Sequence, residues 1–347
     1  MADSLKQTGK GAVAALQTAR KRWLKAQEAR RALAVLTRQN GPLPQATIQR
    51  AHQDAVDRFG AARHAAWLMV YAAAQGEYRD GWLPDSYYIE TVMPRINGTA
   101  HHLGRVRTTN PIFFDSGSVH DLLYILNGRL LGPDHKALTP DQAVDILRSS
   151  GSDVVFKADH SGFGQGVRTI ATADLGPQDL SGLGNGVVQP KITGHPVFDR
   201  FGSTALATLR IGTVLPDTGA PEVRTCYLKL GRSGHSHVIA RDQIRIAVDW
   251  TSGDLDGFGY HSDWRRVTQI PGSDAGFDGV SVPAIGKAVA TVVDLHAQMP
   301  LARYICWDLA IDAQEQIQLL EWEGGVVSFA EAVQGPCFAG LGWDRFR

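Results

Sequence analysis

The sequence predicts an α+β protein with a helical N-terminal region and a body built mostly of sheet. Apolar residues recur at near-helical spacing through much of residues 12–74. From residue 154 to residue 230, short segments rich in β-branched and aromatic residues follow one another. The chain has 347 residues, of which 44% are hydrophobic, so it can bury a large core and divide into two or three packed units.

The N-terminal region is basic. The first forty residues carry nine Lys and Arg residues against two acidic ones, Asp3 and Glu28. Apolar residues at near-helical spacing predict one amphipathic helix within residues 12–38. They are Leu16, Ala19, Trp23, Ala26 and Leu33. Such a helix either docks on a membrane surface or a partner, or packs its apolar stripe on the rest of the protein. We favour packing, because apolar stripes usually face a core.

The remaining elements follow from periodicity and from turn residues. A second helical stretch runs from about Thr47 to Ala74 and ends near Gly76. Residues 81–125 are aromatic and interrupted by prolines, which predicts short elements. A helix over 140–147 has Thr139 as its N-cap. The other expected elements are strands at 154–156, 167–170, 187–189, 204–214 and 223–230, a helix at 284–298, and two strands within 304–323 joined by the polar turn 312–316.

Composition excludes several classes of function. Lys plus Arg and Asp plus Glu both total 35, so no overall charge favours nucleic acid as a partner. The three cysteines are odd in number and far apart, unlike a zinc site or a disulfide framework, and this fits reduced thiols in the cytosol. No apolar run approaches the roughly 20 residues that span a bilayer, and the N-terminus lacks the apolar core of a signal peptide. We therefore expect a cytoplasmic protein.

A glycine-rich loop, Ser161 to Gly166, separates a strand that carries Lys157 from a second strand-like segment. Glycines let backbone N–H groups approach an anion closely. A Walker loop would end in Gly-Lys-Ser/Thr, and a dinucleotide-binding loop would open a helix; neither pattern is present here. The pattern favours a β-hairpin lid that closes over phosphates, with Lys157 supplying a charge. The alternative is a plain hairpin turn beside a solvated lysine.

Acidic residues gather on the two strands within 304–323. If the turn is centred between Gln314 and Glu315, Asp308 lies opposite Glu321, and Cys306 lies opposite Glu323. The three carboxylates then share one face of a half-buried pair of strands and repel one another unless a cation compensates them. Magnesium suits such oxygen ligands together with substrate phosphates. The alternative is a solvated acidic edge whose register differs by one residue.

The lysine strand, the glycine loop and the distant acidic strands together resemble the ATP-grasp superfamily. More narrowly, residues 120–343 resemble the sugar-transfer-associated ATP-grasp family, which is related to glutamate-ligase-like proteins. The runs that carry this resemblance are 155–159, 161–166, 188–191, 195–196, 208–211, 230–232, 307–308 and 320–323. The resemblance implies an ATP-grasp fold, in which two α+β subdomains clasp ATP, here with an N-terminal helical region. The implied division is a helical region at 1–80, a mixed linking subdomain at 81–135, a lid subdomain at 136–190 and a C-terminal subdomain with the metal site at 191–347.

The resemblance also implies roles for particular residues. The ATP-binding set is Lys157, Ser161, Gly162, Phe163, Gly164, Gln165, Gly166, Gln189, Pro190, Lys191, Ile192 and His195. Within this set, Lys157 contacts the α and β phosphates, and residues 189–192 form the hinge that holds adenine. His195 has three alternatives: it approaches the ribose, it caps a helix, or it is a core histidine. Arg210, with either Arg224 or Lys229, stabilises the transferred phosphate. The Mg²⁺ ligands are Asp308, Glu321 and Glu323.

Three features of the chain differ from the family pattern or leave it open. Glu323 stands where the superfamily usually has Asn, which adds negative charge to the metal site. The segment 241–245 replaces the family's Gly-Gly segment on the acceptor side. A second cation for the phosphates comes from Arg105, Arg107 or Lys136, and the sequence does not choose among them.

The resemblance implies an ATP-dependent ligase that joins a carboxylate to an amine or a thiol through an acyl phosphate and releases ADP and phosphate. The expected partners are small carboxylates and amines derived from amino acids or sugar acids, with no nucleic acid; a homodimer remains open, and membrane association is not favoured. A second hypothesis is a phosphotransferase acting on a sugar or polyol hydroxyl, with a base among His235, His237 and Asp242. A third is a catalytically silent nucleotide-binding scaffold.

Overall fold

The computed structural model describes residues 2–115, 119–161, 166–231, 238 and 241–346, and their side chains except at positions 2–18 and 21. The chain forms two compact units. The first comprises Met1–Pro94, Asp263–Arg265 and Val326–Arg347, and the second comprises Arg95–Ser262 and Arg266–Gly325. The division into four parts that the resemblance implies stays a prediction. Among the described residues, no helix is both long enough and apolar enough to cross a bilayer.

The first unit is helical, as the sequence predicts. Its elements are α1 (Ala2–Asn40), α2 (Gln45–Asp57), η1 (Ala62–His64), α3 (Ala65–Gln75), α4 (Asp85–Tyr87), η2 (Tyr88–Val92), the start of α5 (Met93–Ile96), α10 (Ser328–Val333) and η6 (Trp343–Arg345). The second predicted helix is in fact two, because the chain turns at Gly60, where φ is +77°, between α2 and α3. The predicted end near Gly76 is confirmed, and this glycine adopts the left-handed C-cap conformation.

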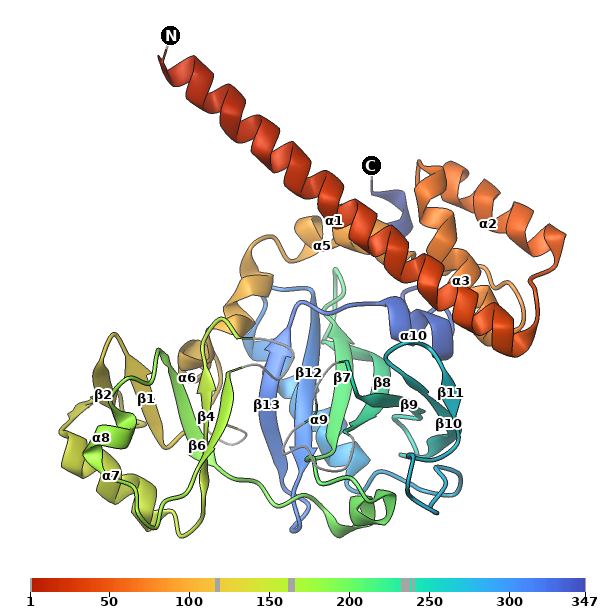
Figure 1. Cartoon of the computed structure of the whole chain (residues 1–347). Coiled ribbons are helices and arrows are strands. Elements are labelled where there is room, and N and C mark those ends of the chain that lie inside the picture. The colour runs from red at the N-terminus through yellow and green to blue at the C-terminus, as the bar shows by residue number, and fades with distance from the viewer. Residues whose placement is uncertain (1, 116–118, 162–165, 232–237, 239–240, 347) are drawn as a thin grey trace. The chain divides into compact units, whose positions relative to one another are not determined.

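The buried face of α1 differs from the expected one. The helix packs against α3 (Figure 1) with Ala29, Ala32 and Leu36, which are spaced three and four residues apart and are at most 1% exposed. Trp23 is 60% exposed, so the expectation that it packs on the protein is wrong. Small alanines allow close helix contact, whereas the wider stripe chosen from the sequence includes a side chain on another face.

The second unit contains two antiparallel sheets, and the first has six strands (Figure 1). These are β1 (Leu123–Leu126), β2 (Arg129–Leu131), β3 (Ala137–Leu138), β4 (Val154–Ala158), β5 (Val167–Ile170) and β6 (Gly186–Pro190), in the order β3-β2-β1-β6-β4-β5. Helices α7 (Pro140–Ser149) and α8 (Pro177–Leu180) contribute to its small apolar core. Thr139 caps α7 as predicted, with Gln142 completing a capping box. The strands β4, β5 and β6 confirm the predicted ones, whereas β1 to β3 were not anticipated.

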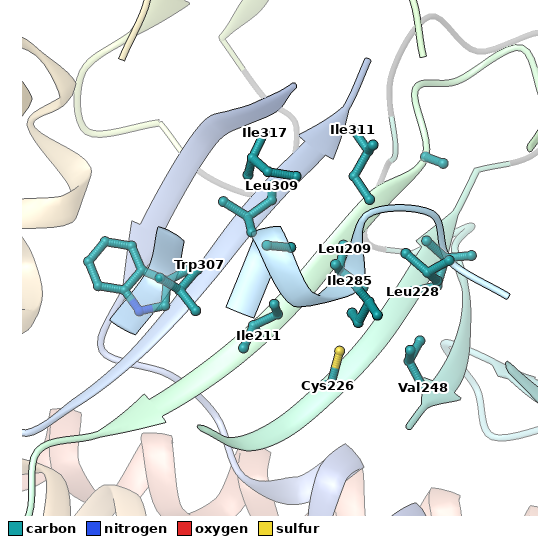
Figure 2. Packing of buried hydrophobic residues seen from close by; sticks show 14 of the residues in the cluster. Leu209, Ile211, Cys226, Leu228, Val248, Ile285, Trp307, Leu309, Ile311 and Ile317 are labelled. Carbon is teal, nitrogen blue, oxygen red and sulfur yellow. The ribbon is translucent and has the colours of Figure 1, made fainter. Parts of the chain in front are cut away.

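The second sheet has seven strands. These are β7 (Thr208–Val214), β8 (Glu222–Leu230), β9 (Ile244–Val248), β10 (Leu255–His261), β11 (Arg266–Val267), β12 (Tyr304–Ile311) and β13 (Ile317–Glu323), in the order β11-β10-β9-β8-β7-β12-β13. Helix α9 (Ile285–Gln298) covers one face, where alternate strand residues such as Ile211, Leu228 and Leu309 pack together (Figure 2). Because successive side chains alternate, the charged residues Arg210, Lys229 and Asp308 of these strands lie together on the opposite face. Short elements between the sheets complete the unit: η3 (Ala100–Arg105), η4 (Arg107–Thr109), α6 (Asn110–Phe113) and η5 (Pro196–Phe201).

The register of β12 and β13 confirms the expected acidic pairing. Asp308 lies opposite Glu321, and Cys306 lies opposite Glu323. The expected turn centre is wrong, however. Ile311 pairs with Ile317, so the register near the turn differs by one residue from the register of the pair Asp308 and Glu321. A β-bulge at Leu320 absorbs the difference. The expectation of a half-buried strand also needs correction, because every residue of β12 is buried.

Candidate functional site

A cavity of about 290 Å³ lies inside the second unit. One wall comes from β4, β5 and β6 of the six-stranded sheet, and the other comes from β7, β8, β12 and β13 of the seven-stranded sheet. Its apolar lining includes Val155, Val167, Ile192, Phe198, Leu206, Leu230 and Leu320. Its charged lining comprises Arg107, Lys157, Lys191, Lys229, Asp199, Asp308 and Glu321. The lining therefore offers both apolar surface for a flat group and positive charge for an anion.

Asp308 is the centre of a buried charge network on the polar face of the seven-stranded sheet. Its carboxylate is 2% exposed and accepts two hydrogen bonds from Arg210, at 2.5 and 2.7 Å, and one from Lys229. Arg210 is the cross-strand neighbour of Asp308 on β7, and Lys229 comes from β8. Burial alone would raise the pKa of Asp308, but the two cations outweigh it and hold this pKa below its usual value. Asp308 is therefore ionised and firmly oriented.

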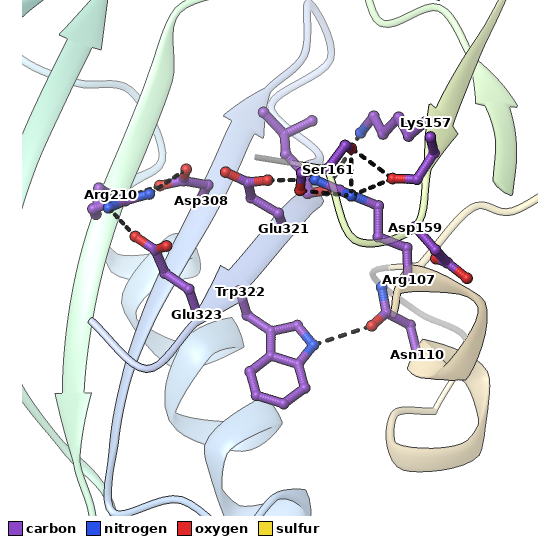
Figure 3. Close-up of polar contacts among 12 residues, drawn as sticks. Arg107, Asn110, Lys157, Asp159, Ser161, Arg210, Asp308, Glu321, Trp322 and Glu323 are labelled. Atoms are coloured by element: carbon purple, nitrogen blue, oxygen red, sulfur yellow. Dashed lines mark hydrogen bonds and ion pairs between the residues drawn. The ribbon is translucent and has the colours of Figure 1, made fainter. Parts of the chain in front are cut away.

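Glu321 carries the second carboxylate of the cavity. It accepts a hydrogen bond of 2.7 Å from Nη2 of Arg107 (Figure 3). Burial and the neighbouring Asp308 raise the pKa of Glu321, against the opposing effect of Arg107. Two carboxylates directly opposite each other on neighbouring strands repel, so this pair favours a cation between or beside them.

Arg107 is held in place by the six-stranded sheet as well as by Glu321. Its Nη1 donates to the carbonyl of Ala158 at 2.7 Å and to Oγ of Ser161 at 3.2 Å, at the start of the glycine-rich loop (Figure 3). The next residue, Thr108, donates its hydroxyl to Asp159 at 2.7 Å. Arg107 therefore connects the lysine strand to the acidic strands. Of the three candidates for a second phosphate cation, it is the one that lines the cavity; Arg105 is exposed and Lys136 pairs with Asp134 on the surface.

Lys157 lies on β4 and points toward β13. Its Nζ donates to the carbonyl of Leu320 at 3.4 Å, and Leu320 is the residue at the bulge. Burial, followed by the nearby Arg107, lowers the pKa of Lys157 to about 8. An amine with few compensating partners in a cavity is suited to bind a phosphate, because the phosphate restores the lost solvation and supplies the opposite charge.

The expected hinge residues also line the cavity: Gln189, Pro190, Lys191 and Ile192. The side chain of Gln189 is fixed by a hydrogen bond of 2.6 Å to Asp121. The Lys191 amide is engaged with the carbonyl of Asp153. His195 lines the cavity too, and its Nδ1 accepts from the amide of Val197 at 3.2 Å, so the expected alternative of a helix cap is confirmed for the 3₁₀-helix η5.

The remaining expected residues are distributed differently. Gly162, Phe163, Gly164 and Gln165 lie outside the described residues, as do His235 and His237. Gly166 has φ +76°, and a side chain there would also clash with Ser161, so the end of the loop requires glycine. Of the two cations on β8, Lys229 lines the cavity, whereas Arg224 pairs with Glu222 at the other end of the strand. Glu323 accepts from Arg210 at 2.5 Å and is not part of the cavity wall.

The carboxylates of Asp308 and Glu321 fit Mg²⁺ in their chemistry. Magnesium is typically held by one or two carboxylates together with substrate phosphates, and this cavity presents two such groups on paired residues beside several cations. Within the described part of the chain, no group of three or more His, Cys, Asp or Glu side chains is arranged to hold a metal ion. The fit therefore concerns a pair of carboxylates, not a cage of three.

Several residues of the site were not anticipated from the sequence; one is Asp199 in the cavity lining, and two others are Asp121 and Leu320. Asp121, which is 7% exposed and holds Gln189, lies in a segment without clear periodicity. Leu320 was expected only as part of an apolar strand, and its position at the bulge follows from tertiary pairing. No local pattern could have identified either residue.

Comparisons with known proteins found one family and several solved structures to which this chain is similar. The model of a family described as sugar-transfer associated ATP-grasp matches residues 179–327. No curated protein matches the chain. Similar solved structures include the N5-carboxyaminoimidazole ribonucleotide synthetase of Thermotoga maritima, with 9% identity, a TM-score of 0.38 and coverage of 66% of this chain and 44% of that one. The ATP-grasp ligase PsnB, solved with a phosphomimetic variant of its minimal precursor, Mg and ADP, shows 14% identity and a TM-score of 0.40 over 85% of this chain and 73% of that one.

The biotin carboxylase domain of the 2-oxoglutarate carboxylase of Hydrogenobacter thermophilus shows 10% identity and a TM-score of 0.38, over 68% of this chain and 44% of that one. The first similar structures are matched over 44%, 58% and 50% of their own lengths, so the chain spans about half of each. These values are too low to assign a shared activity. The family match confirms the resemblance expected from the sequence: this is an α+β chain with an N-terminal helical region that resembles the sugar-transfer associated ATP-grasp family over residues 179–327.

Proposed function

We propose that this chain binds ATP with Mg²⁺ in the cavity between its two sheets and acts as an ATP-dependent ligase that joins a carboxylate to an amine. One observation carries the proposal: Lys157 and Arg107 line a single cavity together with the opposed pair Asp308 and Glu321, and much of the remaining lining is apolar. The order of these parts along the chain is the one that the family resemblance implies. The match of the family model to residues 179–327 supports the part of this assignment that concerns Asp308 and Glu321; Lys157 and Arg107 lie outside the matched range.

The proposal places the nucleotide in one orientation. The purine would lie against apolar lining residues such as Val155 and Ile192, near the hinge backbone. The phosphates then lie toward Lys157 and Arg107, which supply positive charge from two different elements. Magnesium would be held by Asp308 and Glu321 and would neutralise charge on the phosphates. The glycine-rich loop begins at Ser161, three residues after the lysine strand ends, and its residues 162–165 lie outside the described part of the chain.

The reaction has two balanced steps. An oxygen of the substrate carboxylate attacks the γ-phosphorus, the bond to the β-γ bridging oxygen breaks, and ADP leaves with that electron pair. The nitrogen of the amine then attacks the carbonyl carbon of the acyl phosphate; the carbon–oxygen bond breaks, phosphate leaves, and the nitrogen loses a proton to water. Lys229 contributes positive charge where phosphate negative charge accumulates, since its Nζ reaches Asp308 at the cavity wall.

The proposal is tested by following phosphate and its oxygen atoms. A panel of amino acids and uronic acids, each with and without an amine, is incubated with ATP and Mg²⁺, and ADP and free phosphate are measured. We expect both products only when a carboxylate and an amine are present together. With an ¹⁸O-labelled carboxylate, one ¹⁸O atom should appear in the released phosphate. Phosphate esterified to a substrate hydroxyl would contradict the ligase and support the phosphotransferase hypothesis. Tight ATP binding with no turnover of any panel member would support a scaffold.

The two cations of β8 provide an internal comparison. Lys229→Gln should lower turnover at least tenfold, because it removes a charge at the cavity, on the scale of a single electrostatic contact in a transition state, about 10²-fold. Arg224→Gln removes a charge from the same strand at a position outside the cavity wall. Equal effects of the two substitutions would contradict the placement of the γ-phosphate at Lys229.

A further inference from the structure

We infer that Glu323 is a positioning residue that orients Asp308 through Arg210, and not a third ligand of the metal. The inference rests on the proposed function and assigns Glu323 a role different from the one that the family resemblance implies. Glu323, Arg210 and Asp308 form a continuous chain of contacts, from carboxylate to guanidinium to carboxylate (Figure 3).

The contacts of Arg210 determine this role. Its Nε and Nη2 grip both oxygens of Asp308, at 2.5 and 2.7 Å, while Nη1 donates to Oε1 of Glu323 at 2.5 Å. A guanidinium is planar, so contacts on two of its edges fix both its position and its rotation. Among the described residues, the hydrogen bonds that Arg210 would keep without Glu323 are those to Asp308, the group that it is meant to orient. The carboxylate of Glu323 therefore anchors the far side of the guanidinium.

The position of Glu323 argues against direct contact with a metal that Asp308 and Glu321 share. Glu323 pairs with Cys306, two residues along the ladder from the pair Asp308 and Glu321, which is about 7 Å by the rise of a strand. Asp308 and Glu321 line the cavity, and Glu323 does not. Among the described residues no group of three acidic, His or Cys side chains is arranged around a common point. A neutral Asn at this place would have no charge with which to hold Arg210.

The balance of charges around Asp308 explains why a second carboxylate beside Arg210 is useful. Arg210 and Lys229 both contact Asp308, which would leave that carboxylate with little negative charge to offer a metal. The negative charge of Glu323 offsets part of the positive charge of Arg210. Asp308 thus remains firmly held and keeps enough negative charge for a cation. Partners that orient a metal ligand typically contribute about 10- to 100-fold to metal affinity.

A double-mutant cycle separates the two roles. ADP binding is measured by calorimetry across a Mg²⁺ titration for wild type, Glu323→Gln, Arg210→Gln and the double variant. We expect Glu323→Gln to raise the Mg²⁺ midpoint about tenfold in the wild-type background and to leave it unchanged within about twofold when Arg210 is already Gln. Glu321→Gln serves as the control for a direct ligand, and its effect should persist in both backgrounds. An effect of Glu323→Gln that also persists without Arg210 would overturn the inference.

The metal-free protein gives an independent readout. A carboxylate that serves only as a ligand repels its neighbours when no metal is bound, so Glu323→Gln would raise the melting temperature in EDTA. A carboxylate that anchors Arg210 predicts a lower melting temperature, and the difference should vanish in the Arg210→Gln background. This second measurement needs no nucleotide. If wild type bound no ADP at any Mg²⁺ concentration, the proposed function would fail, while the melting temperatures would still decide whether Glu323 holds Arg210.

Discussion

Replacement of Asp308 by Asn tests the buried charge network most directly. The substitution keeps the shape of the side chain and removes its charge, so it leaves Arg210 and Lys229 without their common counter-ion. Both cations are 8% exposed, and the carboxylate between them is 2% exposed. Little water therefore surrounds the pair, apart from what the cavity lined by Lys229 and Asp308 admits.

The expected loss of stability is large for a change of one atom. Removing one partner of a buried ion pair typically costs about 3–5 kcal/mol, because a charge remains buried without compensation. The pKa of Asp308 is held below its usual value, so its stabilising effect is fully present above about pH 4 and is lost only as the pH falls through the lowered value. We expect wild type and Asp308→Asn to differ most at neutral pH and to converge in strong acid.

The measurement is urea unfolding at pH 7 and at pH 3, in EDTA, with circular dichroism as the signal. Asp134→Asn is the matched control, because Asp134 pairs with Lys136 on the surface, where both side chains are more than half exposed. The control should show no change. A free energy of unfolding for Asp308→Asn that equals the wild-type value at pH 7 would refute the view that Asp308 compensates two buried cations.

Three further predictions concern other charged groups. ADP affinity should decrease as the pH rises through about 8, because Lys157 loses its proton there, and Lys157→Arg should abolish this decrease in binding titrations at pH 7 and 9. Arg107→Gln should weaken ADP binding at least tenfold while Arg105→Gln does not, since only the former lines the cavity. Burial raises the pKa of Glu331 to about 8, so the folded state retains the proton of this carboxyl group while the unfolded state loses it above about pH 4.5. The free energy of unfolding should therefore fall from pH 5 to pH 8 by an amount on the order of a few kcal/mol. Glu331→Gln should remove this pH dependence in urea unfolding.

Much of the sheet could be predicted because its signals are local. The strands β5 and β12 have the predicted bounds, and the capping box of α7 follows from the residues Thr139 and Gln142. Alternation along β12 also separated the core residues from Asp308 correctly. Such periodicities depend only on neighbours in the chain, so one sequence suffices to recognise them.

The sequence-based predictions fail where tertiary contacts determine which residues are buried, which strands pair and which side chains enter the cavity. The exposed Trp23 lies on a helix whose packing face is chosen by α3 and by small alanines, not by its largest apolar side chain. The three short strands β1 to β3 form through tertiary pairing, since β1 pairs with β6, β2 with β1 and β3 with β2, and their residues carry no strong pattern of their own. Arg107 could not be separated from Arg105 by sequence, since only the fold around η4 directs one of them to the cavity.

The bulge at Leu320 is another feature that tertiary pairing determines, and its role can be tested. Ile311 pairs with Ile317 and Leu309 with Leu319, whereas Asp308 pairs with Glu321, so Leu320 is the extra residue. It lines the cavity, and its carbonyl accepts from Lys157.

Deletion of Leu320 should make the ladder continuous, with Asp308 still opposite Glu321, and so preserve the fold and the acidic pair. Lys157 would then lose its acceptor and the cavity would lose part of its apolar wall. We expect the deletion variant to melt cooperatively but to bind ADP at least tenfold more weakly, whereas Leu320→Ala, which keeps the carbonyl, should lose only about fourfold, on the scale of burying one methylene group less. A deletion variant that binds ADP like wild type would mean that the bulge serves the register alone, while one that does not fold would mean that the turn and the acidic end of the hairpin cannot share one register.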